Sequence, residues 1–183
     1  MILDFQDLDI KGVKLFNLKL YKDDRGSFSE IFQSKLDNPE FKIKYIQENE
    51  SISNYGVFRG MHLQKGSNSQ SKLIRVIKGK IIDVICDLRK SSPSFKKIIF
   101  IELNPNQLLF LPRGLAHGFL SLEEGSILNY KCDNFYNQRS ESGFNLFKSS
   151  VEIDFPLEIE NIVISDKDNS LPGLDNSYIY EEL

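Results

Sequence analysis

Residues 72–88 read KLIRVIKGKIIDVICDL, and this stretch decides the fold class. In residues 81–88 one set of alternate positions is apolar throughout, while the other set alternates between isoleucine and aspartate. A repeat of two residues is the signature of a β-strand, because successive side chains point to opposite faces. Residues 72–77 form a second apolar strand, and Gly79 between the two can adopt the positive φ of a tight turn. The stretch therefore predicts a β-hairpin around Gly79.

The same short apolar runs recur along most of the chain. FKKIIFIEL (95–103), QLLFLP (107–112) and GSILNYKC (125–132) read as further strands, and polar turns such as RKSSPS (89–94) separate them. Many short strands joined by polar turns are typical of a β-sandwich or barrel, so the predicted fold class is all-β. The end of the chain departs from this pattern, because SDKDNSLPGLDN (165–176) predicts a loop that leads to a short C-terminal helix or irregular tail.

Length and composition favour one domain that binds a small molecule. With 183 residues and 40% hydrophobic content, the chain can bury a sizeable core, so we expect a single domain over residues 1–183. The net charge is only −3 and the basic residues are scattered, which argues against nucleic acid or an anionic membrane as a partner. The sequence lacks an apolar run of about 18 residues, and its start lacks the features of a signal peptide. We therefore expect a cytoplasmic protein without a membrane span.

The two cysteines are expected to be buried free thiols. Cys86 and Cys132 each lie inside an apolar, strand-like segment, and thiols stay reduced in the cytosol. The sequence has no C-x-x-C motif and no cysteine–histidine cluster, so a zinc site is not expected.

The chain has only two histidines, and both lie in apolar runs. His62 lies in FRGMHLQ, and His117 follows the turn residues of LPRGLAHGFL. In a regular strand Arg59 and His62 face opposite sides, unless Gly60 marks a β-bulge that turns both toward one side. Either both histidines are buried structural residues or both point into one pocket. Their positions at strand starts favour a shared cavity.

The residues around the histidines favour proton transfer over metal chemistry. No second histidine or glutamate close to His62 in the sequence completes a set of metal ligands, so no metal is expected. Without a metal, histidine serves best as a general base near neutral pH. Lys72 could then stabilise an enolate oxygen, and Tyr130 could return the proton. A lysine that extends to water and a tyrosine that packs in the sheet remain the alternatives.

Other side chains fit a nucleotide ligand. Tyr136 lies six residues after Tyr130 and keeps its strand parity, so both rings can face one cavity. An aromatic ring in that place could stack on a base. Guanidinium groups suit a diphosphate, and the chain carries more cations than a neutral ligand needs, in the arginines at 25, 59, 75, 113 and 139.

Six motifs, in order, carry a resemblance to a known family. They are DDRGSFSEIF, IQENESISNYGVFRGMHLQ, QSKLIRVIKGKIIDVICDLRKSSPSF, LPRGLAHGFLSL, YKCDNFYN and ISDKDNSLP. Together they cover nearly the whole chain, and the sequence resembles the dTDP-4-dehydrorhamnose 3,5-epimerase family. The resemblance implies a cupin fold, which is a double-stranded β-helix or jelly roll, in a metal-free and usually homodimeric enzyme. It also implies that no cofactor is needed, and the sequence contains neither GxGxxG nor a P-loop.

The resemblance implies a role for each member of a catalytic set. His62 matches the family's base. Asp168 in SDKD matches the carboxylate that orients the imidazole, with Asp166 as the alternative alignment. Lys72 matches the lysine near the C4 oxygen of the sugar, and Tyr130 matches the acid on the opposite face of the ring.

The resemblance also implies a set of binding residues. Arg59 matches the position at the diphosphate of the ligand, Tyr136 the position on its nucleotide side, and His117 a supporting histidine of the pocket. Arg25 and Phe28 match positions that reach the site of the neighbouring subunit. Gln47, Asn49 and Glu30 match further family positions near the ligand, as Arg25 also does.

The implied reaction is inversion of C3 and C5 in dTDP-4-keto-6-deoxy-D-glucose, because the ketone acidifies both neighbouring C–H bonds. An enzyme that inverts a single centre, or that uses a CDP- or GDP-linked sugar, would need the same base, lysine and acid. A cupin that binds a sugar nucleotide without catalysis and a metal-dependent cupin oxygenase are the alternatives from other classes. Departures from the family pattern at Met61, Leu63 and Asn129 bear on the sugar and on the number of centres inverted.

Overall fold

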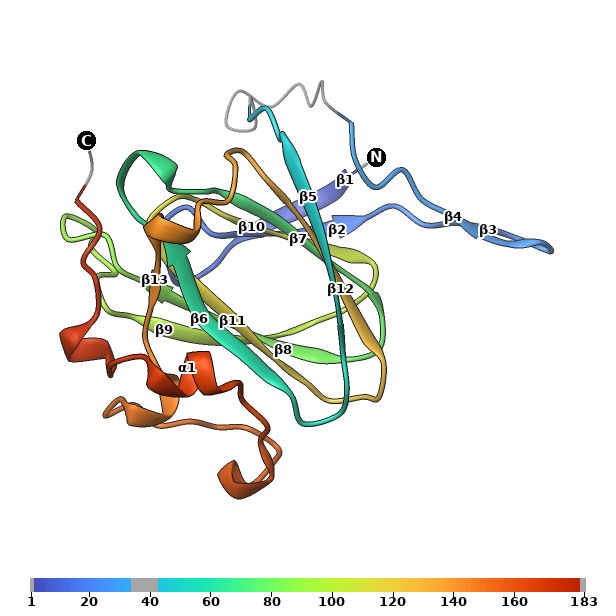
Figure 1. Ribbon diagram of the computed structural model, residues 1–183. Helices are drawn as coiled ribbons and strands as arrows, with labels where there is room; N and C mark the ends of the chain where they lie inside the picture. Colours follow the sequence, from blue (N-terminus) through green and yellow to red (C-terminus); the bar gives the residue numbers. More distant parts are fainter. Residues whose placement is uncertain (1, 34–42, 182–183) are drawn as a thin grey trace.

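The computed structural model describes residues 2–33 and 43–181, and two antiparallel sheets packed face to face form its body (Figure 1). The six-stranded sheet has the order β1 (Ile2–Asp7), β2 (Lys14–Leu18), β10 (Gln107–Leu111), β7 (Lys72–Lys78), β12 (Ser126–Cys132) and β5 (Gln47–Ser53). The five-stranded sheet has the order β13 (Glu141–Gly143), β6 (Phe58–Gln64), β11 (Leu115–Ser121), β8 (Ile81–Asp87) and β9 (Ile98–Leu103). The chain crosses repeatedly between the two sheets, which confirms the predicted all-β jelly roll.

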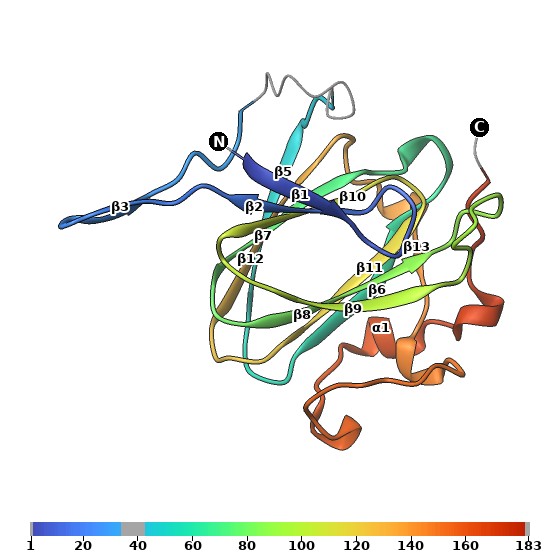
Figure 2. The same cartoon turned by 180° about the vertical axis from the view of Figure 1, so that it is seen from behind.

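Two further parts lie outside this body. A two-stranded arm, β3 (Tyr21–Asp23) and β4 (Gly26–Phe28), extends away from it, as both views show (Figures 1 and 2). After β13 the chain packs against the outer face of the five-stranded sheet and contains the helix α1 (Asp166–Ser170). The expected short helix is present, but it lies within the stretch 165–176 that was expected to form the loop before it. The 3-10 turns among the described residues are η2 (Gly66–Asn68), η3 (Gln138–Ser140), η4 (Leu146–Lys148), η5 (Ile159–Asn161) and η6 (Leu174–Asn176). Within the described ranges, no helix is both long and apolar enough to cross a membrane.

The hairpin expected around Gly79 is wrong. Strand β7 pairs with β10 and β12, whereas β8 pairs with β11 and β9, so the turn carries the chain from one sheet to the other. Gly79 does take the positive φ of +86°, and a Cβ there would lie 2.3 Å from Oγ of Ser126. The glycine is therefore needed for a tight corner between sheets, which has the same local signal as a hairpin turn.

Strand β8 is buried on both faces. Ile81 and Ile85 point between the sheets into the main apolar cluster. Val84 and Cys86 point the other way and pack under residues of the C-terminal segment. Burial explains why one face of the strand is wholly apolar. On the other face Asp83 and Asp87 are buried as well, and they bind His117 and Arg89 respectively. Cys86 is a buried free thiol, as expected, and so is Cys132.

Candidate active site

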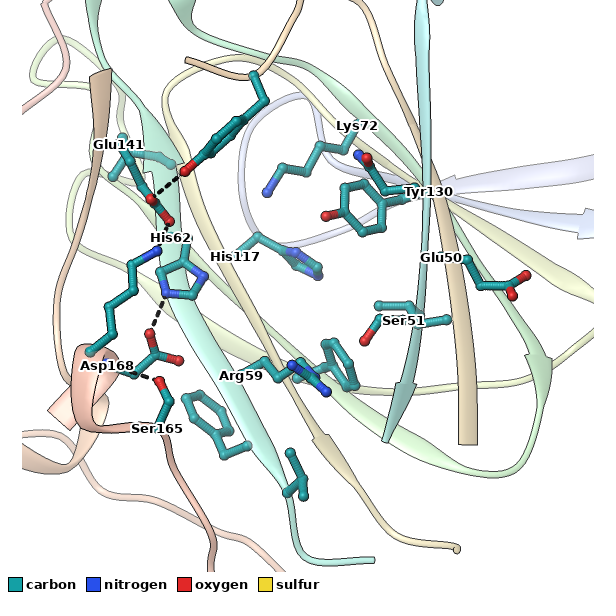
Figure 3. Close-up of a pocket in the computed structure, with 18 of the residues that line it drawn as sticks. Glu50, Ser51, Arg59, His62, Lys72, His117, Tyr130, Glu141, Ser165 and Asp168 are labelled. Carbon is teal, nitrogen blue, oxygen red and sulfur yellow. Dashed lines mark hydrogen bonds and ion pairs between the residues drawn. The ribbon is translucent and has the colours of Figure 1, made fainter. Parts of the chain in front are cut away.

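A pocket of about 860 Å³ lies between the two sheets and the segment around α1 (Figure 3). Its polar side chains come from β5, β6, β7, β11, β12 and β13, from α1, and from the loop positions Gln70, Tyr136 and Ser165. Strands of both sheets therefore meet at one cavity, although the residues are far apart in the sequence. Of the twelve residues expected at the site, nine line this pocket: Gln47, Asn49, Arg59, His62, Lys72, His117, Tyr130, Tyr136 and Asp168.

A β-bulge at Gly60 turns Arg59 and His62 toward the pocket, as expected. His62 pairs with His117 and Arg59 pairs with Phe119, so β6 has two residues between these pairs where β11 has one. Gly60 has a φ of +131°, and a Cβ on it would lie 2.5 Å from Cα of Gly118. Only glycine fits this close approach of two backbones.

His62 forms a hydrogen-bonded pair with Asp168, which lies in α1. Nε2 of His62 lies 2.7 Å from Oδ1 of Asp168, and the backbone N–H of Gly60 donates to Oδ2 at 3.2 Å. Burial opposes ionisation of this carboxyl group, but the hydrogen bonds outweigh burial and lower the pKa of Asp168. The contact is made by Asp168, which is 5% exposed, whereas Asp166 is exposed and lies outside the pocket lining.

Lys72 and Tyr130 lie together on the six-stranded sheet, across the pocket from His62 (Figure 3). Lys72 is opposite Cys132 in the register, so Tyr130, two residues away, shares its face. The Nζ atom of Lys72 lies 5.7 Å from the ring centroid of Tyr130. Burial lowers the pKa of Lys72 and raises the pKa of Tyr130. The phenol therefore stays protonated at neutral pH and is able to donate a proton.

His117 forms a second histidine–aspartate pair, deeper in the pocket. Its Nε2 lies 2.8 Å from Oδ2 of Asp83 on β8, and both side chains are buried. Burial lowers the pKa of His117, although the charge of Asp83 opposes this shift. The other carboxylate oxygen of Asp83 has no hydrogen-bond partner within the described residues. The sequence marks Asp83 only as a strand residue, and its pairing with a histidine 34 positions away gives no local signal.

Three side chains at the rim of the pocket are joined by hydrogen bonds. Glu141 on β13 accepts from the Tyr136 hydroxyl at 2.7 Å and from Nζ of Lys167 at 2.6 Å. The hydrogen bond to Glu141 raises the pKa of Tyr136. Tyr136 follows the end of β12 at Cys132, so strand parity is not the reason that its ring reaches the pocket. Glu141 and Lys167 line the pocket without having been expected there.

Comparison with known proteins agrees with this geometry. A family model described as dTDP-4-dehydrorhamnose 3,5-epimerase matches residues 7–176. The chain belongs to this epimerase family. The dTDP-4-dehydrorhamnose 3,5-epimerase of Methanothermobacter thermautotrophicus is 36% identical over 180 residues, which are 96% of this chain and 97% of the relative. The enzyme class is therefore that of an isomerase.

Two solved structures bear on the ligand. The dTDP-6-deoxy-D-glucose-3,5-epimerase of Legionella pneumophila, in complex with dTDP-4-keto-L-rhamnose, matches the epimerase chain with a TM-score of 0.90 at 30% identity, over 98% of both chains. A 3'-monoepimerase of Streptomyces bikiniensis, in complex with dTDP-quinovose, matches with a TM-score of 0.84 at 28% identity, over 92% of this chain and 86% of the other. Both relatives hold a dTDP-linked sugar, so a nucleotide sugar is the class of ligand that this family binds.

The remaining expected binding residues of this epimerase lie outside the pocket of their own chain. Arg25 and Phe28 belong to the β3–β4 arm, and Glu30 follows it. Phe28 is 69% exposed, and Arg25 pairs with Asp23 at 2.6 Å on the same arm. These residues are therefore not contributed to the site by the chain that forms the pocket.

The arrangement of histidines and acidic side chains in the epimerase bears on metal binding. Among residues 2–33 and 43–181, no group of three or more His, Cys, Asp or Glu side chains is arranged to hold a metal ion. His62 and His117 each face one aspartate. Such pairs suit proton transfer, because a carboxylate fixes the orientation of the imidazole.

Proposed function

We propose that this epimerase inverts C3 and C5 of dTDP-4-keto-6-deoxy-D-glucose, the dTDP-4-dehydrorhamnose 3,5-epimerase reaction. The observation that supports it best is the arrangement of two proton-transfer groups on opposite walls of one pocket. His62 belongs to the five-stranded sheet and Tyr130 to the six-stranded sheet, with Lys72 beside Tyr130 (Figure 3). A 4-keto sugar between the walls can lose a proton to one side, and the planar enolate that forms can gain one from the other.

His62 is the proposed base. Its Nε2 is engaged by Asp168, so Nδ1 is the nitrogen left to take a proton from carbon. The C–H bonds on either side of the C4 ketone are acidic because the electron pair moves onto the C4 oxygen. Asp168 orients the ring and stabilises the imidazolium that forms, and this proton then passes to solvent.

Lys72 and Tyr130 are proposed to complete the step on the opposite side of the sugar. The Lys72 ammonium stabilises the negative charge on the C4 oxygen, and such stabilisation is strong where water is excluded. Tyr130 donates its hydroxyl proton to the carbon from the face opposite His62, which inverts that centre. The phenolate then regains a proton from solvent. The net reaction moves protons only, so it needs no redox cofactor.

The remaining pocket residues are proposed to bind the ligand. Arg59 takes the diphosphate, because a guanidinium can make two parallel hydrogen bonds to phosphate oxygens. Tyr136 lies on the nucleotide side, where its ring can stack on a base. His117 supports the pocket next to His62. Gln47 and Asn49 are also proposed to contact the ligand, and they are already joined by a hydrogen bond of 3.0 Å.

Proton NMR in deuterated water tests this function. The purified protein is mixed with dTDP-4-keto-6-deoxy-D-glucose, and loss of the C3 and C5 hydrogen signals is followed. Loss at both positions supports the proposal. Loss at one position indicates a single-centre epimerase, the activity named for the similar 3'-monoepimerase. If neither signal decays, CDP- and GDP-linked 4-keto sugars are tested next, and a protein inactive with all three is a binding protein without catalysis.

A homodimer is proposed to supply the arm residues. The exposed Phe28 and the neighbouring Arg25 would reach the pocket of the second subunit, since they lie far from the pocket of their own chain. Light scattering after gel filtration should give twice the monomer mass. Removal of both side chains should weaken binding of the sugar nucleotide.

The two buried free thiols fit a cytoplasmic location, which we propose for the enzyme.

A further inference from the structure

Arg59 joins the two sheets at one side of the pocket. It lies on β6 of the five-stranded sheet, and its guanidinium reaches β5, the last strand of the six-stranded sheet. Its Nε–H donates to Oγ of Ser53 at 3.0 Å, and Nη2 donates to the carbonyl of Ile52 at 3.2 Å. Both acceptors are neutral, so neither of them cancels the charge of the guanidinium.

These two contacts leave one end of the guanidinium available. The group has five N–H donors in a fixed plane. Ser53 and Ile52 accept from Nε and Nη2, which lie along one side of that plane. Within the described residues, the opposite end, with both hydrogens of Nη1 and one of Nη2, remains for a ligand. A pair of parallel hydrogen bonds from this end matches two oxygens of a phosphate.

Ser53 is a buried and therefore fixed acceptor for the side chain of Arg59. It is the last residue of β5 and is only 1% exposed, whereas Arg59 is an exposed residue of the pocket wall. An arginine in such a place loses much rotamer freedom when it binds a ligand. Two hydrogen bonds that exist before binding reduce this loss, because the side chain is already held in one orientation.

We propose that Ser53 is a positioning residue that presets the guanidinium of Arg59 for the diphosphate of the ligand. The inference rests on the proposed function, in which Arg59 binds that diphosphate. Ser53 acts through Arg59 and does not touch the ligand. Its loss should therefore weaken binding of the nucleotide diphosphate while leaving proton transfer at the sugar ring intact.

The test is the affinity of the full-length protein for dTDP, measured by titration calorimetry. We expect Ser53→Ala to raise the Kd about 3- to 10-fold, the size of one ordinary hydrogen bond, because the hydrogen bond to Ile52 still holds the guanidinium in part. In an Arg59→Ala background, Ser53→Ala should raise the Kd for dTDP by less than about twofold more, since the serine then has no guanidinium to position. In turnover, KM should rise while kcat stays within about twofold. Ser53→Cys keeps the volume but is a weak acceptor, so it should change the Kd in the same direction.

Ser126 provides a matched control. It faces Ser53 in the register of β12 and β5, is also 1% exposed, and its hydroxyl donates to the carbonyl of Glu123 at 2.8 Å, with the carbonyl of Lys80 at 3.3 Å as the alternative acceptor. Ser126→Ala removes the same atom at the same depth, so it should keep the Kd for dTDP within about twofold even where it lowers Tm.

Two results would overturn the proposal. One is an unchanged Kd for dTDP in Ser53→Ala. The other is an equal effect of Ser53→Ala with and without the Arg59 side chain, because the serine would then act on binding by another route. Failure of the proposed function has a different signature, since the wild-type protein would show no hydrogen exchange at C3 or C5 of the keto sugar whatever its affinity for dTDP.

Discussion

His62 and His117 lie directly opposite each other on β6 and β11, yet different aspartates hold their imidazoles. His62 is held by Asp168 from α1, and His117 by Asp83 from β8. The side chain of His62 is 30% exposed and that of His117 only 7%. Two neighbouring histidines therefore differ in access to a ligand, and the more exposed of them, His62, is the one that we propose as the base.

This asymmetry predicts unequal effects of the two histidines on hydrogen exchange. His62→Ala should slow exchange at C3 and C5 of the keto sugar by on the order of 10²–10⁴-fold, the usual contribution of a general base. His117→Ala should reduce exchange less, and should lower Tm because it leaves Asp83 buried without its partner. Deuterium NMR and thermal unfolding measure the two effects. Fast exchange in His62→Ala would identify another residue as the base.

Asp168 is predicted to matter to catalysis more than its neighbour Asp166. Asp168→Asn should lower kcat by on the order of 10²–10⁴-fold, because a neutral amide does not stabilise the imidazolium of His62. Asp166→Asn is the matched control, since Asp166 is exposed and lies outside the pocket, and its kcat should stay close to that of the wild type. Equal losses in the two variants would contradict the assignment of the partner.

The same pair predicts a pH dependence of stability. The folded pKa of Asp168 is lowered from 3.8, so the folded state favours the carboxylate. The stabilisation is complete above the unfolded value and is lost as the pH falls through the folded value. Urea unfolding of wild type and Asp168→Asn should therefore show a difference in stability that is present above the unfolded value of 3.8 and shrinks as the pH falls below it. A difference that grew on acidification would have the wrong sign.

The sequence predicts the strands well but not the connections between them. The period of two around Gly79 locates β7 and β8, yet a corner between sheets has the same glycine signal as a hairpin. The sequence predicts a site residue where that residue lies in a recognisable motif, as His62 does. The sequence does not predict Glu141 at the site, because this residue lies in the polar stretch RSESGF and reaches the pocket only when β13 pairs with β6. Long-range register, rather than local propensity, brings such residues together.

Gly60 is predicted to be intolerant of any side chain. Gly60→Ala should lower the free energy of unfolding by about 2–4 kcal/mol, because the φ of +131° and the contact with Gly118 both exclude a Cβ. Gly125→Ala is the control, since Gly125 also has a positive φ but a Cβ there meets nothing within 4 Å, and it should lose about 1 kcal/mol. Urea denaturation gives both values. A mild effect at Gly60 would mean that β6 and β11 can separate at the bulge.

Lys72 is predicted to lower the free energy of unfolding. Burial lowers the pKa of its ammonium despite the favourable charges of Asp83 and Glu141, so the folded state disfavours the cation. Lys72→Met should therefore abolish epimerisation while raising the free energy of unfolding by about 0.5–2 kcal/mol at pH 7. The penalty is complete below the folded pKa and disappears as the pH rises toward 10.5, so the gain should shrink in alkaline buffer. If the variant were less stable than the wild type at pH 7, the attraction of Lys72 to Asp83 and Glu141 would outweigh its burial.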